Sequence, residues 1–83
     1  MQLLALQKRI AIAGATGYIG GRLAPRLLQD GSLVRCLVRS PGKLAGREWS
    51  SHPHVEVRQS DLEDVTGLAR DLEDCYAAFY LVH

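Results

Sequence analysis

Three glycines at intervals of three residues, Gly14, Gly17 and Gly20, form the stretch of this sequence whose spacing could serve chemistry. A short apolar run at residues 10–13 precedes them and an amphipathic segment follows, which predicts a strand, a tight turn and the start of a helix. The first glycine would allow the turn, the second would leave room for a phosphate, and the third would let helix and strand pack closely. Backbone N–H groups and the positive end of the helix dipole would then face a diphosphate.

The segment Gly-Ala-Thr-Gly-Tyr-Ile-Gly resembles the fingerprint of the extended and atypical short-chain dehydrogenases/reductases. It differs from the G-x-G-x-x-G of other dinucleotide enzymes because residue 15 is Ala. A P-loop starting at the same glycine would need Gly-Lys where Ile19 and Gly20 stand. The alternative to a cofactor site is a glycine-rich turn that binds nothing. The cofactor-binding residues that the resemblance implies in this segment are Gly14, Thr16, Gly17, Tyr18, Ile19 and Gly20.

The remaining sequence alternates between strand-like and helix-like segments. We expect strands at residues 9–13, 33–38, 54–58 and 77–82, the third of them at a sheet edge. We expect helices at residues 18–30, at residues 41–49, and after an N-cap near Asp64.

Several apolar positions should face the core from these helices. In the first helix they are Ile19, Leu23, Leu27 and Leu28, and in the last helix they are Leu68, Ala69 and Leu72. Gly31 suits the position after the first helix, and Pro25 should kink that helix without dividing it.

This β-α-β-α-β-α-β pattern predicts an α/β fold with a parallel sheet and helices on both faces. Right-handed crossovers imply the strand order 3-2-1-4, which is the first part of a Rossmann-type, doubly wound fold. We therefore expect residues 1–83 to form a single unit, the N-terminal part of an NAD(P)-binding Rossmann domain whose later strands and substrate region are absent.

The end of the second strand bears on the choice of nicotinamide cofactor. NAD-preferring folds place Asp or Glu there, about 20 residues beyond the glycines, whereas this chain has Arg39, with Ser40 and Lys43 close by. A guanidinium can bind a 2′-phosphate through paired hydrogen bonds, and a carboxylate would repel it. We expect NADP(H) rather than NAD(H); the alternative is a solvated arginine after a strand.

Two further pairs of residues are cofactor candidates through the family resemblance. Asp61 and Leu62 follow the third strand, where the family places an Asp-Leu pair beside the adenine. An Asp that only closes a turn before a helix is the alternative. Val82 and His83 finish the fourth strand, which in the family passes the ribose and pyrophosphate.

Composition excludes several other classes of function. The 83 residues carry a net charge of +1, which gives no reason to expect a nucleic acid or membrane partner. No apolar run approaches the roughly 20 residues of a membrane span. Cys36 and Cys75 are expected to be free, buried thiols in a cytoplasmic protein. His52 and His54 lack acidic or cysteine companions, so we expect no metal site.

The catalytic residues of the family have no counterpart here. Its reaction uses a Tyr-x-x-x-Lys pair, and none of the three tyrosines has a lysine four residues later. We expect an oxidoreductase-type cofactor module that shows no turnover alone. The segments Arg-Cys-Leu-Val-Arg and Tyr-Leu-Val-His look closest to NmrA-like or NAD(P)H-binding members, so a non-catalytic dinucleotide sensor is the alternative. The exposed edge of the last strand predicts self-association.

Overall fold

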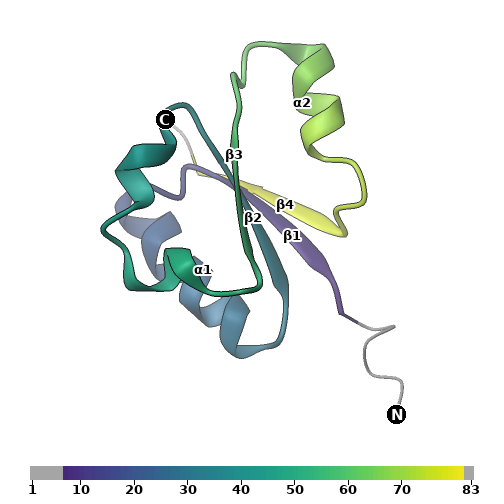
Figure 1. The fold of residues 1–83 in the computed structure, drawn as a ribbon. Coiled ribbons are helices and arrows are strands. Elements are labelled where there is room, and N and C mark those ends of the chain that lie inside the picture. Colours follow the sequence, from purple (N-terminus) through teal and green to yellow (C-terminus); the bar gives the residue numbers. More distant parts are fainter. Residues whose placement is uncertain (1–6, 82–83) are drawn as a thin grey trace.

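A computed structural model describes residues 7–81 of the chain (Figure 1). The elements follow one another in the order β1 (Arg9–Ala13), α1 (Tyr18–Gln29), β2 (Leu33–Val38), η2 (Pro41–Leu44), η3 (Glu48–Ser51), β3 (Val55–Gln59), α2 (Val65–Asp71) and β4 (Ala77–Tyr80), η being a 3-10 helix.

The four strands form one parallel sheet in the order β3-β2-β1-β4. Ile12 of β1 pairs with Cys36 of β2 on one side and with Phe79 of β4 on the other. The order confirms the predicted first part of a Rossmann-type fold, with β3 at one edge. All four strands run the same way, so their carboxyl ends and the loops that follow them share one end of the sheet.

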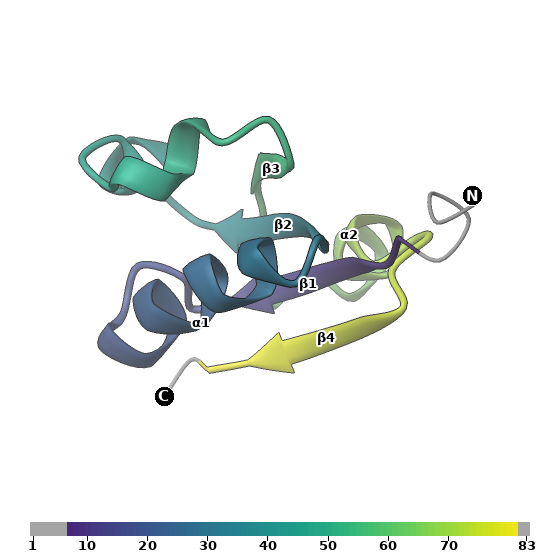
Figure 2. The same cartoon turned by 90° about the horizontal axis from the view of Figure 1, so that it is seen from below.

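The apolar core lies between the sheet and α1. Ile12, Val34 and Cys36 point to this face of the sheet and are almost fully buried, and α1 covers them with Ala24. Leu44 of η2 closes the same core, with Trp49 of η3 packed against it. Figure 2 shows α1 and the 3-10 segments on this face and α2 on the other. The predicted helices on both faces are therefore present.

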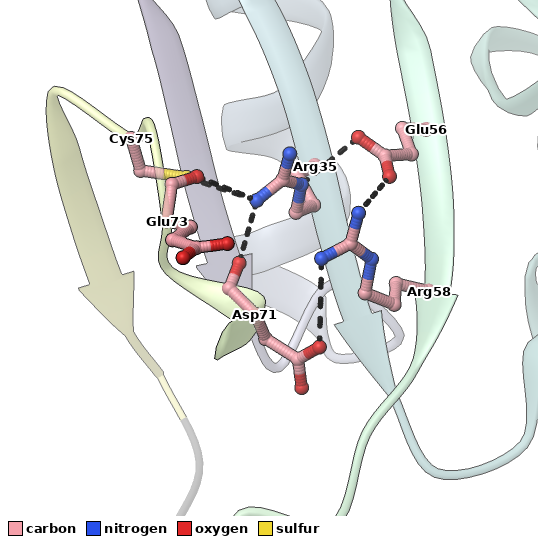
Figure 3. A network of polar contacts seen from close by, with 6 residues as sticks. All are labelled: Arg35, Glu56, Arg58, Asp71, Glu73 and Cys75. Carbon is pink, nitrogen blue, oxygen red and sulfur yellow. Dashed lines mark hydrogen bonds and ion pairs between the residues drawn. The ribbon is translucent and has the colours of Figure 1, made fainter. Parts of the chain in front are cut away.

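The opposite face of the sheet is held by polar contacts around Arg35, a residue only 5% exposed (Figure 3). Its Nε donates to Oε1 of Glu56 at 2.9 Å. Its Nη1 donates to the backbone carbonyls of Asp71 at 2.7 Å and Glu73 at 3.0 Å. The arginine of β2 thus satisfies carbonyl groups at the end of α2, which has no buried residue of its own.

The Glu56 carboxylate lies between two guanidinium groups, those of Arg35 and Arg58. Partial burial by itself would raise the pKa of Glu56. The hydrogen bonds and positive charges of the two arginines outweigh burial and hold this pKa below its ordinary value of 4.5. The hydrogen bond to Glu56 in turn raises the pKa of Arg58, which also pairs with Asp71 at 3.6 Å. Both shifts favour the charged forms of Glu56 and Arg58.

Several expected elements differ from the observed ones. The helix predicted at residues 41–49 is two separate 3-10 segments, because Gly42 and Gly46 favour no helical backbone and the chain turns between them. The third strand begins at Val55 instead of residue 54, and β4 ends at Tyr80. The last residue predicted for that strand, Val82, lies outside the described residues.

Two apolar side chains expected in the core are exposed. Ile19 is 61% exposed, because the buried stripe of α1 runs through Gly20 and Ala24, with the half-buried leucines beside it. Ala69 of α2 is also exposed, since that short helix packs on the sheet only through one side. The helix α1 runs through Pro25 without a break, and Gly31 follows it with a φ of 85°. Both observations agree with the prediction of a single helix and its end.

Candidate functional site

A cleft of about 300 Å³ opens at the carboxyl end of the sheet. The loops after β1, β2 and β3 and the last residue of β4 contribute to it, and ligands lie at this end of the sheet in doubly wound folds. Its lining residues are Gly14, Thr16, Leu37, Val38, Arg39, Ser40, Lys43, Ser60, Leu62, Glu63 and Tyr80.

Two of the three spaced glycines are required by the fold itself. Gly14 has a φ of 103°, and a Cβ there would lie 2.9 Å from the backbone carbon of Leu81. A Cβ on Gly20 would lie 2.3 Å from the carbonyl oxygen of Gly14. Both contacts are with backbone, so neither can be relieved by a side-chain movement. These positions confirm the turning role of Gly14 and the close-packing role of Gly20.

The middle glycine, Gly17, has no such requirement. Its φ of −83° suits any residue, and a Cβ there would lie 3.4 Å from the Gly14 carbonyl oxygen. Gly17 is exposed and is the N-cap of α1, where Ser, Thr, Asp or Asn would stabilise the helix more. The helix has no capping side chain and no acidic residue in its first turn. Its positive end is therefore left unneutralised by these residues, which is the arrangement that suits an anion.

One wall of the cleft carries positive charge. The candidate residues Arg39, Ser40 and Lys43 all line it, and all three are exposed. No carboxylate of the described residues pairs with Arg39 or Lys43 at ion-pair distance. Glu63 lines the same cleft and reduces its net charge to +1. The wall can therefore bind a further anionic group.

The loop after β3 supplies further lining residues. Leu62 lines the cleft described above, whereas Asp61 lines a neighbouring hollow of about 430 Å³ together with Arg39 and Gln59. Oδ1 of Asp61 accepts the backbone N–H of Glu63 at 3.0 Å, so one of its oxygens closes the turn. The turn role that the sequence left as an alternative for Asp61 is thus present, and its place beside the cleft is present as well.

Four predicted residues of the glycine segment do not line the cleft. Gly17 is the N-cap of α1, and Gly20 is a buried residue within that helix. Ile19 is exposed, and Tyr18 is 76% exposed with the guanidinium of Arg22 5.2 Å from its ring centre. The predicted contacts of Val82 and His83 lie outside the described residues.

Other kinds of site find no support in residues 7–81. The two cysteines there are free, Cys36 buried and Cys75 half-buried, which corrects the expectation that both are buried. Burial raises the pKa of the Cys36 thiol to about 11, so it is a poor nucleophile at neutral pH. No group of three potential metal ligands occurs there, and no helix there is long and apolar enough to cross a membrane.

Sequence reasoning missed several residues of the site. Val38, Ser60 and Tyr80 line the cleft because each stands at or just beyond the carboxyl end of a strand, and that rule could have found them. Ser60 is 6% exposed, and its buried hydroxyl has no hydrogen-bond partner among the described residues. Arg47 touches the glycine turn from a loop 31 residues away, and no sequence signal pointed to that contact.

Comparison with known families settles the chain's relationship. The model of the NmrA-like family matches residues 6–83. This chain belongs to the NmrA-like family.

Relatives of this NmrA-like chain include reductases. It is 30% identical over 77 residues to dihydroflavonol 4-reductase of Callistephus chinensis, covering 87% of this chain and 21% of that protein. The chain thus spans about a fifth of the length of that relative.

Among solved structures, a mutant form of NmrA superposes with a TM-score of 0.73 and 32% identity, over 89% of this chain and 23% of that one. A short-chain dehydrogenase/reductase from Veillonella parvula, solved in complex with NADP, superposes with a TM-score of 0.76 and 23% identity. That match covers 88% of this chain and 34% of the other. The predicted kinship with NmrA-like proteins is confirmed, as is the Rossmann-type fold.

Proposed function

We propose that this chain binds a nicotinamide dinucleotide, with the diphosphate at the start of α1. The observation that carries the proposal is the contrast among the glycines: Gly14 and Gly20 are required by backbone contacts, and Gly17 is not. A glycine that costs helix stability and relieves no contact is explained if its missing side chain makes room for a ligand. The NADP complex of the Veillonella parvula enzyme supports this choice of ligand.

The residues of the cleft, together with the first turn of α1 beside Thr16, fit such a group. Backbone N–H groups of the first turn of α1 and the side chain of Thr16 would hold the diphosphate. Apolar side chains of Val38 and Leu62 would flank the adenosine half, with Asp61 at its edge. The dinucleotide supplies hydride chemistry when it is bound, and these residues serve only to bind and orient it.

We propose further that the chain prefers NADP(H) to NAD(H). Arg39, Ser40 and Lys43 line one wall without a described carboxylate paired to either cation, which suits a 2′-phosphate. Titration with NADPH and NADH, followed by nicotinamide fluorescence, tests both proposals. We expect NADPH to bind at least about tenfold more tightly, and Arg39→Ala to remove most of that difference.

A matched control is Arg26→Ala, which removes the same charge from the last turn of α1, at the other end of the helix. It should leave the preference unchanged. Equal binding of NADPH and NADH would contradict the preference, and failure of both to bind would contradict the dinucleotide site.

For the longer protein, we propose a reductase-type hydride transfer in the cytoplasm. The dihydroflavonol 4-reductase relationship and the free cysteines support this. The 83-residue chain should show no turnover of its own, because it holds no Tyr-x-x-x-Lys pair. The proposal predicts a Tyr-x-x-x-Lys pair in the longer protein. A Tyr→Phe variant of that pair should keep cofactor binding and lose reductase activity.

We also propose that this chain self-associates through β4. No described strand covers its outer edge, and Phe79 and Tyr80 are 40% and 66% exposed. Light scattering after size exclusion should show a dimer or larger species at high concentration, and Phe79→Lys should shift it toward monomer. A monomer at all concentrations would contradict this.

A further inference from the structure

One basic side chain contacts the glycine turn from outside the cleft. Nη2 of Arg47, in the loop between η2 and η3, donates to the carbonyl oxygen of Thr16 at 2.8 Å. The side chain is half-buried and has no carboxylate partner among the described residues. Its charge is therefore directed at the backbone of the turn.

This hydrogen bond fixes a peptide unit that is already held at its other end. The Thr16 carbonyl belongs to the same peptide as the N–H of Gly17, which donates to the carbonyl oxygen of Gly14 at 3.0 Å. Because a peptide is planar and trans, its C=O and N–H point in opposite directions. Arg47 on one side and Gly14 on the other thus set the plane of the peptide that leads into α1.

A fourth glycine in this region is explained by the same guanidinium. Gly21 lies inside α1, where alanine would favour the helix, and it is not one of the three spaced glycines. A Cβ on Gly21 would lie 2.7 Å from Nη1 of Arg47, and the next atom it would meet is 3.5 Å away. The only close contact is thus with the end of a flexible side chain. An alanine here would displace the guanidinium and leave the backbone undisturbed.

We propose that Arg47 is a positioning residue for the dinucleotide site, seated against Gly21 so that it holds the Thr16–Gly17 peptide in the binding conformation. The ligand part of this inference rests on the proposed function. The fixing of the turn does not, because it is a property of the chain without ligand.

Two substitutions test the role from opposite directions. Arg47→Ala removes the hydrogen bond, and Gly21→Ala leaves Arg47 in the sequence but pushes its guanidinium away from Thr16. Each should weaken NADPH binding about tenfold, the effect of losing one charge-assisted hydrogen bond that orders the site. Gly21→Ala should at the same time raise the urea midpoint of unfolding, because alanine favours the helix. If Arg47 only stabilised the fold, Gly21→Ala would change the NADPH affinity and the urea midpoint of unfolding in the same direction.

The pair should also be non-additive. In the double variant Arg47→Ala with Gly21→Ala, binding should be no weaker than in either single variant, because both remove the same contact. Arg47→Lys, which keeps a donor and the charge, should recover part of the affinity. Arg26→Ala is the control for loss of charge and should leave affinity unchanged.

Amide hydrogen exchange of the ligand-free chain separates this inference from the proposed function. The N–H of Gly17 should exchange faster in Arg47→Ala and Gly21→Ala than in wild type or Arg26→Ala. If wild type binds neither NADPH nor NADH but exchange responds in this way, the dinucleotide proposal fails and the positioning of the turn stands. Unchanged exchange and unchanged affinity in both variants would overturn the inference.

Discussion

The two α-helices begin at the same end of the sheet and in opposite ways. α1 follows β1 and starts at Gly17, which has no side chain to cap it. α2 follows β3 and starts at Asp64, whose Oδ1 accepts the N–H of Gly67 at 3.1 Å. One N–H of the first turn of α2 is thus satisfied by a side chain, whereas the first turn of α1 has no such cap and is left open to an anion.

The two helices also differ in the contacts that hold them on the sheet. α1 has 12 residues and packs on the core through Gly20 and Ala24, so it can hold its place without a cap. α2 has 7 residues, none of them buried, and depends on its Asp64 cap and on Arg35 at its other end. Packing energy in α1 offsets a missing cap, and that allows its N-terminus to serve a ligand.

The largest expected effect comes from Gly20→Val, which disrupts the packing of α1 on the glycine turn. Its Cβ would lie 2.3 Å from the Gly14 carbonyl oxygen, so the helix must move off the turn. We expect a loss of about 3 kcal/mol or more in the free energy of unfolding. Urea unfolding followed by far-UV circular dichroism measures it. A loss below about 1 kcal/mol would show that helix and turn are not locked together.

The next largest effect is expected from Gly17→Asp, which gives α1 the same N-cap residue type that α2 has. The N-cap φ of −83° accepts Asp, so α1 should be unchanged or a few tenths of a kcal/mol more stable. The carboxylate would stand where we propose the diphosphate, and NADPH binding should fall about 100-fold or more. Gly17→Ala, with no charge, should lose less affinity. Retained affinity in the Asp variant would place the ligand elsewhere.

A smaller effect is expected from Asp64→Ala, which removes the cap of α2. The N–H of Gly67 loses its acceptor, so the free energy of unfolding should fall by about 1 kcal/mol. NADPH affinity should stay within about twofold, because Asp64 does not line the cleft. Asp64→Asn keeps an acceptor and should keep most of the stability. An equal loss in both variants would mean that the cap is not the cause.

The smallest effect concerns the Arg35 network that holds the end of α2. The pKa of Glu56 is lower in the folded chain than its ordinary value of 4.5, so folding favours the charged form. Its contribution is complete above that value and is lost as the pH falls below it through the folded pKa. The side chain is 42% exposed, so solvent screening limits the loss to less than about 1 kcal/mol.

Unfolding midpoints of wild type and Glu56→Gln, compared from neutral pH down to acid pH below the ordinary Glu56 pKa of 4.5, measure this contribution. The gap between the two proteins should narrow as the pH falls. A gap that stays constant would assign the effect of Glu56 to packing instead of charge.

The regular part of the fold could be predicted from local patterns. β1, β2 and the strand order 3-2-1-4 were predicted as observed, because apolar runs alternate with amphipathic segments and crossovers are right-handed. The region of residues 41–51 was not, since 3-10 turns make few local hydrogen bonds and follow the tertiary contacts of Leu44 and Trp49.

In the candidate site, too, some features follow from local sequence and others from tertiary contacts. The residue types and spacing determined the glycine turn, the basic residues after β2 and the Asp-Leu pair after β3, because each is local to one strand end. The tertiary structure alone decided which glycine is dispensable to the fold, that Arg35 would hold the end of α2, and that Arg47 would reach Thr16. The two arginine contacts join residues 31 or more positions apart, and only the packing of the sheet and its loops brings such residues within hydrogen-bond distance.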